Sequence, residues 1–269
     1  MQFGVHVPQL GALGDPQTLV DLAQRAELAG WDGFFLWDHV MHANDPDACD
    51  PWVALGAIAA TTSRLVLGPL VTPLPRRRPW KVARETTTLD RLANGRTVLG
   101  AGIGTDHYRE FTAFSEPATD DRTRAAQLDE ALTIITQLWT GERVSFTGEH
   151  YRVDDVVQRP RPVQQPRVPI WCAARWPARA PLRRAARWDG VVPLGAHTPD
   201  DVAALRAVVA EQRETTAPFA IALASDETAS RDLTAYADAG ATWWLAAIRP
   251  FDALADSRAL VDGGPPRAG

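Results

Sequence analysis

Short apolar runs alternate along the chain with segments whose apolar residues recur every three or four positions. The run from Phe3 to Val7 stops at Pro8, and the run from Gly33 to Trp37 ends in polar sequence. The segment between them opens with Asp15-Pro16 and closes at Gly30, which is a usual start and stop for a helix. A short run that is apolar on both faces is typical of a strand buried in a parallel sheet. The pattern therefore predicts strands that alternate with helices.

This alternation continues along the chain. The first four strands start at intervals of about 31 residues, the length of one strand and one helix. Parallel strands need crossover connections, and eight of them can close a sheet into a barrel without an edge. The sequence therefore predicts an α/β fold, a (β/α)8 TIM barrel that forms a single domain over residues 1–269. The strands are expected at residues 3–7, 33–37, 64–72, 97–102, 168–173, 190–194, 219–224 and 242–248.

The fourth unit is longer than the others and predicts an insertion between strand 4 and strand 5. Its helix, from about Arg122 to Thr140, is followed by a segment from Val144 to Val153 that resembles a hairpin turning at Thr147-Gly148. A Pro-rich stretch from Arg159 to Pro166 comes next. Strand-helix units resume directly after it, so we interpret the stretch as part of the insertion and not as a domain linker.

The composition narrows the choice of partners. The chain is 45% apolar and 23% charged, with a net charge of −5, and it has no long basic stripe of the kind that nucleic-acid binders carry. No stretch approaches the roughly 18 apolar residues that a membrane span needs, and the N-terminal residues lack a signal-peptide pattern. Cys49 and Cys172 form no disulfide framework or CxxC motif. We therefore expect a cytoplasmic protein that binds neither nucleic acid nor membranes.

The active site of such a barrel lies at the carboxyl ends of its strands. Strand 2 ends in Asp38-His39, and an imidazole titrates near neutral pH and suits proton transfer. Neighbours on an extended chain point to opposite sides, so Asp38 is not expected to hydrogen-bond His39. In the structural alternative both are loop residues, and Asp38 caps the next segment. The candidates at the strand ends are His6, Asp38, His39, Thr72, Gly102, Asp106, His107, Arg175, His197, Ser225 and Arg249.

Two segments near these strand ends predict unusual backbone. Pro69 and Pro73 flank the end of strand 3, and because proline lacks an N–H, a bulge or an unusual peptide is expected there, unless the strand ends early at Gly68. Gly102-Ile103-Gly104 would let a planar ligand approach the backbone, although glycines also serve plain tight turns. Thr105 replaces the third glycine of a dinucleotide fingerprint, which weakens the rival fold, an open doubly wound sheet.

Histidine and arginine side chains leave two other kinds of site open. A metal-dependent barrel hydrolase would use the groups His6, Asp38, His39 and His42. An anion site near the later strands would use Arg175, Ser225 and Arg249. The basic run Arg76-Arg77-Arg78 is interpreted as a solvated loop or a helix-entry cluster. A barrel without catalytic activity, or one that serves as a partner-binding subunit, is a further alternative.

Several motifs, in their order along the chain, resemble the bacterial luciferase-like family of flavin-dependent oxidoreductases, and the resemblance covers nearly the whole chain. The matching segments are Ala29 to Gly33 with Trp37-Asp38-His39, Leu67 to Pro73 with Arg78-Pro79, Thr88 to Leu92 with Gly95-Arg96 and Leu99 to Gly102, Leu138 to Glu142, Gly148 to Tyr151, Arg159 to Pro162 with Pro169 to Trp171, and Ala186 to Gly190.

The resemblance implies a reduced flavin across the barrel mouth, either FMN or the deazaflavin F420. It implies that His39 is the catalytic acid or base, and that the bulge at Pro69-Leu70 carries a non-prolyl cis peptide under the flavin ring. Deazaflavin-dependent relatives commonly have an acid where this chain has Thr105, which departs from their two-residue proton-transfer scheme. The cofactor contacts expected from the resemblance are Asp38, Pro69, Leu70, Val71, Thr72, Gly102, Gly104, Thr105, Ala174 and Arg175.

The resemblance implies an oxidoreductase, and we place first a monooxygenase that uses reduced FMN and O₂ on a small organic substrate. The alternative within the family is F420-dependent hydride transfer. In both cases the cofactor carries the chemistry, and the protein orients it and supplies His39 for proton transfer. Members of the family also pair through helical faces, which implies a homodimer.

Overall fold

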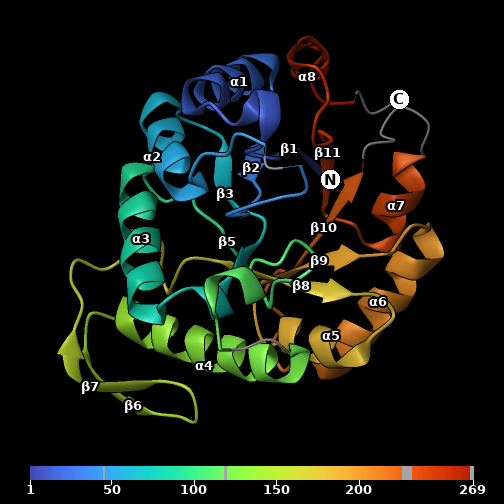
Figure 1. The fold of residues 1–269 in the computed structure, drawn as a ribbon. Helices are drawn as coiled ribbons and strands as arrows, with labels where there is room; N and C mark the ends of the chain where they lie inside the picture. The colour runs from blue at the N-terminus through green and yellow to red at the C-terminus, as the bar shows by residue number, and fades with distance from the viewer. Residues whose placement is uncertain (45, 118–119, 226–231, 267–269) are drawn as a thin grey trace.

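The computed structural model describes residues 1–44, 46–117, 120–225 and 232–266, and its centre is a parallel sheet closed into a barrel (Figure 1). The hydrogen-bonded order of the sheet is β3-β2-β1-β11-β10-β9-β8-β5-β4. Its strands are β1 (Gln2–Val7), β2 (Gly33–Leu36), β3 (Val66–Pro69), β4 (Thr72–Pro73), β5 (Leu99–Gly102), β8 (Ile170–Arg175), β9 (Gly190–Leu194), β10 (Ala220–Ser225) and β11 (Trp243–Ala247).

The segments β3 and β4 are two halves of one barrel strand. Leu67 of β3 forms a parallel bridge with Thr97, and Thr72 of β4 pairs with Ala101 of β5. Both halves therefore pair with the chain segment from Thr97 to Ala101, which includes the start of β5. This pairing closes the sheet into a barrel. With β3 and β4 taken together, the described barrel has the eight parallel strands of the predicted (β/α)8 fold, which is confirmed.

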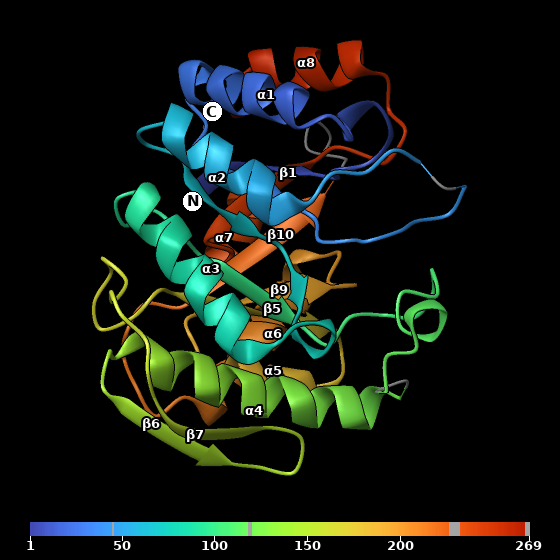
Figure 2. The same cartoon turned by 60° about the vertical axis from the view of Figure 1, so that its left-hand side comes forward.

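Helices surround the sheet. Figure 2 shows α1 beside α8, and it shows α2, α3 and α4 in this order around the outside. They are α1 (Pro16–Ala29), α2 (Pro51–Thr61), α3 (Pro79–Leu92), α4 (Asp121–Trp139), α5 (Arg179–Ala185), α6 (Pro199–Gln212), α7 (Leu233–Ala239) and α8 (Leu254–Asp262). Short 3-10 turns occur at Gly11–Leu13, Leu74–Arg76 and Thr112–Phe114. Among the described residues, no helix is long and apolar enough to cross a membrane.

The helix ends follow the predicted capping chemistry. The Asp15 carboxylate accepts hydrogen bonds from the amides of Gln17 and Thr18, which satisfies N–H groups that a helix start leaves unpaired. At the other end of α1, Gly30 has a φ of +91°, a left-handed conformation that glycine adopts without strain. The predicted start and stop of this helix are confirmed.

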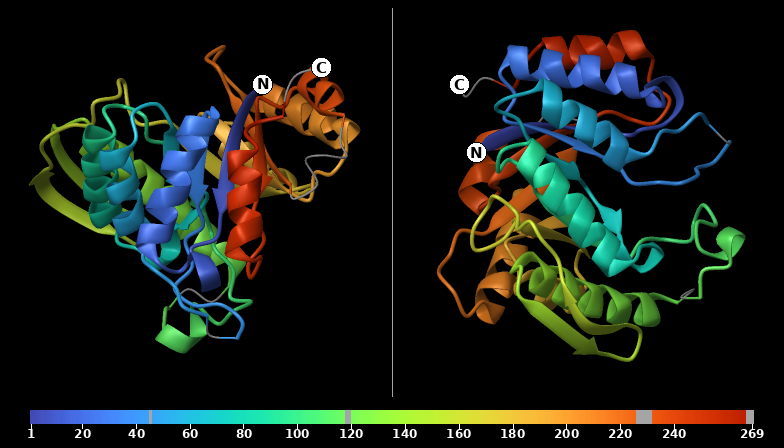
Figure 3. Two further views of the ribbon diagram at one scale, coloured as in Figure 1. Left: turned by 90° about the horizontal axis from the view of Figure 1, so that it is seen from above. Right: turned by 90° about the vertical axis from the view of Figure 1, so that its left-hand side faces the viewer.

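The insertion predicted between strands 4 and 5 is present as an antiparallel hairpin, β6 (Arg143–Thr147) and β7 (Arg152–Val157). It lies alongside α4, as Figure 2 and the right half of Figure 3 show. The Glu130 carboxylate of α4 accepts hydrogen bonds from the backbone N–H groups of Glu149, His150 and Tyr151 in the hairpin turn. This carboxylate therefore anchors the insertion to the outside of the barrel.

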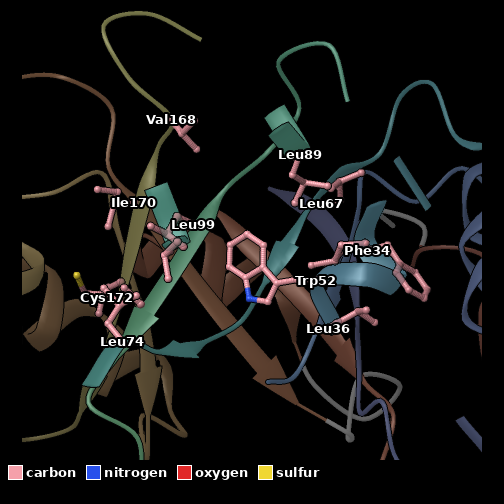
Figure 4. Packing of buried hydrophobic residues seen from close by; sticks show 14 of the residues in the cluster. Phe34, Leu36, Trp52, Leu67, Leu74, Leu89, Leu99, Val168, Ile170 and Cys172 are labelled. Atoms are coloured by element: carbon pink, nitrogen blue, oxygen red, sulfur yellow. The ribbon is translucent and has the colours of Figure 1, made fainter. Parts of the chain in front are cut away.

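The core has two parts, one inside the barrel and one between sheet and helices. The inner part is built around Phe35, Trp171 and Trp243, whose ring centroids lie 5.5 to 5.8 Å apart. The outer part, shown in Figure 4, includes Phe34 and Leu36. Side chains of β2 thus alternate between the two parts, and continuing the alternation puts Trp37 and His39 on the inner side at the barrel mouth.

Gly68 in β3 packs so closely against Val98, just before β5, that a larger residue does not fit there. A β-carbon at Gly68 would lie 1.9 Å from the carbonyl oxygen of Val98, whereas one at Gly56 on α2 would meet nothing within 4 Å. We expect Gly68→Ala to lower the free energy of unfolding by about 3 kcal/mol through overpacking. Gly56→Ala should raise it by about 0.5 kcal/mol, because alanine is the better helix former. Thermal or urea unfolding measures both, and equal stability of the two variants would contradict this packing.

Candidate active site

The ring of His6 lies at the end of β1 and faces the interruption of strand 3. Its Nε2 is 2.7 Å from the carbonyl oxygen of Leu70. A carbonyl oxygen only accepts hydrogen bonds, so Nε2 carries the ring proton and Nδ1 is left as an acceptor. Burial lowers the pKa of His6 to about 4, against the opposing effect of the hydrogen bond to Leu70. His6 is therefore neutral near pH 7 and holds the backbone of strand 3 at the mouth.

The interruption of strand 3 is a non-prolyl cis peptide bond between Leu70 and Val71. The resemblance led us to expect this bond at Pro69-Leu70, and the structure corrects its position by one residue. The reason lies in the strand pairing, because the amide of Leu70 still donates to the carbonyl oxygen of Leu36, 2.8 Å away. The ladder between β2 and β3 thus continues past Pro69 before the backbone turns.

His39 is bound to a buried carboxylate. Its Nδ1 lies 2.9 Å from Oε2 of Glu110, whose side chain is 2% exposed. The other oxygen, Oε1, accepts hydrogen bonds from the amide of Val40 at 2.8 Å and from Arg76 at 2.5 Å. Burial alone would raise the pKa of Glu110, but the hydrogen bond from His39 and the charge of Arg76 outweigh it and leave that pKa lowered. Glu110 is therefore ionised.

An ionised carboxylate can only accept a hydrogen bond, so Nδ1 of His39 carries a proton. In the neutral ring, Nε2 is then an unprotonated acceptor, and 21% of the side chain is exposed at the barrel mouth. This is the arrangement of a general base, and with both nitrogens protonated the same ring is a general acid. The geometry suits proton transfer at Nε2, and the catalytic role of His39 stays a prediction.

Asp38 faces away from His39 and into the protein, as alternation along the strand predicted. Its carboxylate binds Arg77 at 2.8 and 3.1 Å and accepts a 2.7 Å hydrogen bond from the hydroxyl of Thr72. The Asp38 side chain is fully buried, and so is Thr72. Both were expected to contact the cofactor. Because protein encloses them, we assign them instead the support of the β2 end.

The glycines at the end of β5 lie against the interrupted strand 3. A β-carbon at Gly102 would lie 2.8 Å from Cγ2 of Val71, and one at Gly104, where φ is +73°, would lie 2.8 Å from Cβ of Pro73. The structure thus brings together the Leu70-Val71 peptide and the glycine loop, two segments expected to line the cofactor. Thr105 follows on the exposed surface, where its hydroxyl accepts a hydrogen bond from the amide of His107.

Asp106 is not an available acid beside Thr105. It accepts hydrogen bonds from the amides of Phe111 and Thr112, and the first of these is the main cause of its lowered pKa. The carboxylate that reaches His39 is Glu110, five residues after Thr105, the position at which the resemblance implied an acid in deazaflavin-dependent enzymes. Glu110 was not among the predicted site residues.

The strands from β8 onward contribute fewer residues to the candidate active site. At the end of β8, Ala174 is buried in the outer core and Arg175 is exposed, and their roles as cofactor contacts stay predictions. Arg249 forms an ion pair with Asp252 on its own loop. The amide of His197 donates to Asp201 at the start of α6. Of the proposed anion-binding groups, Arg175 is the one that keeps the role of a phosphate contact in our proposal.

Three of the four groups considered as ligands for a hydrolase metal are hydrogen-bonded to other groups of the protein. His6 binds the Leu70 carbonyl, Asp38 binds Arg77, and His39 binds Glu110. His42 is buried and stacks on Tyr108, with ring centroids 3.9 Å apart. Over the described parts of the chain, no three His, Cys, Asp or Glu side chains are grouped to hold a metal ion.

The basic run lies at the entry to α3, which was one of its two interpretations, but Arg76 and Arg77 are not the solvated side chains of the other. The side chain of Arg76 is 7% exposed and that of Arg77 is 19% exposed, and each forms an ion pair with an acid of the site. Arg76 in addition donates to the backbone carbonyl of Asp38 at 2.8 Å. The sequence signal was the presence of adjacent arginines just after a strand end, but their acidic partners lie 34 to 39 residues away along the chain.

The sequence model of the family described as luciferase-like monooxygenase matches residues 1–262. The chain therefore belongs to this family.

Among curated proteins, the F420-dependent glucose-6-phosphate dehydrogenase of Nakamurella multipartita is 38% identical over 172 residues, which cover 62% of this chain and 49% of that protein. The match thus spans about half the length of this relative. Among solved structures, the coenzyme F420-dependent tetrahydromethanopterin reductase of Methanopyrus kandleri has a TM-score of 0.77 at 16% identity, with 98% of both chains covered. An FMN-bound type II Baeyer-Villiger monooxygenase of Pseudomonas putida has a TM-score of 0.69 at 17% identity and covers 83% of this chain and 66% of its own. These two likenesses show the fold.

Replacing Glu110 by Gln tests the buried ion pair. The variant leaves Arg76 charged and buried beside a neutral amide, so we expect a loss of about 3 kcal/mol in the free energy of unfolding at pH 7. The pKa of Glu110 is lowered, so its contribution is full above pH about 4.5 and is lost as the pH falls further. The gap between wild type and variant should shrink in acid. Glu142→Gln, at an exposed site, is the control, and an equally small loss in both variants would refute the assignment.

The neutral state of His6 predicts a second pH dependence. The pKa of His6 in the folded protein, about 4, lies below the ordinary value of 6.5. The free energy of unfolding is therefore highest above pH 6.5 and falls as the pH drops toward 4, because His6 is protonated in the unfolded chain and not in the folded one. His6→Gln retains a donor for the Leu70 carbonyl but does not titrate. We expect wild type to lose roughly 2 kcal/mol more than this variant between pH 6.5 and 4.5. Parallel stability curves for the two proteins in urea unfolding would contradict this prediction.

Proposed function

We propose that the protein is an F420-dependent oxidoreductase that transfers a hydride between the deazaflavin and a small alcohol or carbonyl substrate. The observation that carries the proposal is the ring of His39, with Nδ1 bound to Glu110 and Nε2 left as a proton acceptor at the barrel mouth. An alcohol that gives up a hydride from carbon must also give up its hydroxyl proton, and Nε2 is placed to take a proton.

The cofactor assignment follows the relatives. The sequence analysis placed an FMN monooxygenase first and F420-dependent hydride transfer second. The curated relative at 38% identity carries an F420-dependent name, which supports the second choice. The FMN-bound structure is 17% identical, a likeness that carries the fold and no cofactor. F420, when bound, accepts or returns two electrons as a hydride.

The residues at the mouth fit a flat ring. Side chains at Gly102 or Gly104 would run into Val71 or Pro73, so the glycine loop lies as bare backbone against the Leu70-Val71 peptide. Backbone without side chains permits close approach of a planar group. Leu70 and Val71 would support one face of the ring, Gly102 and Gly104 would border it, and Arg175 would serve the phosphate of its tail.

His39, Glu110 and Arg76 divide the proton chemistry between them. In alcohol oxidation, Nε2 of His39 takes the hydroxyl proton while the substrate carbon loses its hydride, and in the reverse direction the protonated ring returns that proton. Glu110 keeps Nδ1 protonated and orients the ring, and Arg76 keeps Glu110 ionised. The named substrate of the relative, glucose 6-phosphate, is not assumed for this chain, whose match spans half of that protein.

Cofactor binding and His39 are tested together. We expect calorimetry to show binding of F420 at micromolar concentration and weaker binding of FMN. His39→Asn should bind F420 as wild type does but turn over at least about 100-fold more slowly, because a general base is lost. His150→Asn on the insertion hairpin is the matched control and should keep full activity. Failure of wild type to bind F420, or full turnover by His39→Asn, would reject the proposal.

A further inference from the structure

The indole of Trp37 lies on the inner side of β2, between the two histidines of the mouth. Its backbone amide donates to the carbonyl of Val7, which continues the pairing of β1 and β2 by one residue. Its ring centroid is 5.8 Å from that of His6 and 5.7 Å from that of His39. Trp37 was not among the predicted site residues, although it directly precedes Asp38-His39.

The indole N–H of Trp37 is shielded from solvent and has no hydrogen-bond acceptor among the described residues. Two buried indoles elsewhere in the chain show the usual pairing. Trp31 donates to the carbonyl of Val261 at 2.9 Å, and Trp139 donates to the carbonyl of Ala83 at 3.1 Å. A buried donor left unpaired costs about 1 to 3 kcal/mol, so the bare N–H at the mouth indicates an acceptor that the described residues do not supply and that a bound ligand would provide.

One other tryptophan shares this feature but not the location. The N–H of Trp188 is also shielded and unpaired among the described residues. Trp188 precedes β9, at the amino end of the barrel, and packs under Arg167 with the guanidinium 5.2 Å from its ring centroid. It therefore lies at the opposite end of the strands from His39 and serves as the internal comparison.

His6, the neighbour of Trp37, supplies a hydrogen-bond acceptor beside the indole donor. The proton of His6 is on Nε2, which binds Leu70, so Nδ1 of this neutral ring is an acceptor. Trp37 offers a donor and His6 an acceptor, and their rings are 5.8 Å apart. A carbonyl next to a ring N–H, the edge of a pyrimidinedione, presents the complementary acceptor and donor. Deazaflavins carry this edge.

We propose that Trp37 Nε1 and His6 Nδ1 bind the pyrimidinedione edge of the deazaflavin, with Trp37 donating to a ring carbonyl and His6 accepting from the ring N–H. The inference rests on the proposed function and extends it to two residues that orient the cofactor beside His39. Neither group exchanges a proton with the substrate in this role. Their contribution is to cofactor affinity and to the placing of the ring.

The direct test observes the indole N–H itself. In nitrogen-15 labelled wild-type protein, the Trp37 indole signal, identified by its loss in Trp37→Phe, should move on addition of F420, and the Trp188 signal should not. Trp37→Phe keeps an aromatic ring but removes the donor, and we expect its Kd for F420 to rise about tenfold, the worth of one hydrogen bond. Trp188→Phe, the matched control, should bind F420 as wild type does.

The outcomes separate the two levels of the proposal. If wild type does not bind F420, the proposed function fails, and the inference fails with it. If wild type binds F420 while the Trp37 signal stays in place and Trp37→Phe binds equally well, the proposed function stands and this inference is wrong. Should Trp37→Phe fail to fold, the signal in wild type, assigned through the backbone, decides the question alone.

Discussion

The Glu110 carboxylate is the interaction on which the rest of the site depends. It binds three groups from two other segments of the chain, namely the His39 ring, the Val40 amide and the Arg76 guanidinium. A carboxylate that is 2% exposed is stable as an ion only when its charge is paired and its oxygens are hydrogen-bonded, and these groups do both. One buried charge thereby holds the end of β2, the entry to α3 and the loop after β5 together.

A second buried acid supports the same strand end from the other side. Asp38 is paired with Arg77, and Arg76 also bonds the Asp38 carbonyl. The two adjacent arginines therefore bind two acids, Glu110 and Asp38, that lie on opposite faces of the β2 end. Alternation along β2 makes this possible, because Asp38 points toward the helices and His39 toward the mouth. The result is an imidazole whose free nitrogen has a fixed position, which is what proton transfer in a defined geometry requires.

Much of the fold could be read from the chain, because barrel architecture depends on patterns that are local. Asp15, Gly30 and the apolar run at Gly33 to Leu36 act within a few residues of themselves, and they marked a helix and a strand that the structure contains. The prolines at 69 and 73 likewise marked the interruption of strand 3. The cis peptide bond that the resemblance implied at Pro69-Leu70 lies one residue further on, because the pairing of Leu70 with Leu36 depends on a neighbouring strand.

The chemistry of the site was less accessible, because its decisive contacts are distant in sequence. His39 and Glu110 are separated by 71 residues, and no local pattern distinguishes Glu110 from a surface acid. The arginines at 76 and 77 had the composition of a solvated cluster and became buried partners only through the acids that the fold brings to them. The N–H of Trp37, which is unpaired among the described residues, has no sequence signal at all, because only the folded structure shows which acceptors lie near it.

The proposed function requires that a hydride is transferred at the barrel mouth and that no oxygen is inserted into the substrate. The most direct measurement incubates the protein in parallel with F420 and with reduced FMN, each with a panel of small secondary alcohols that carry deuterium on the carbinol carbon, under labelled dioxygen. Mass spectrometry then follows both labels. The hydride-transfer hypothesis predicts that deuterium passes from a substrate alcohol to the reduced deazaflavin and that no oxygen label enters the product. Label from dioxygen in the product, without deuterium in the cofactor, would contradict it.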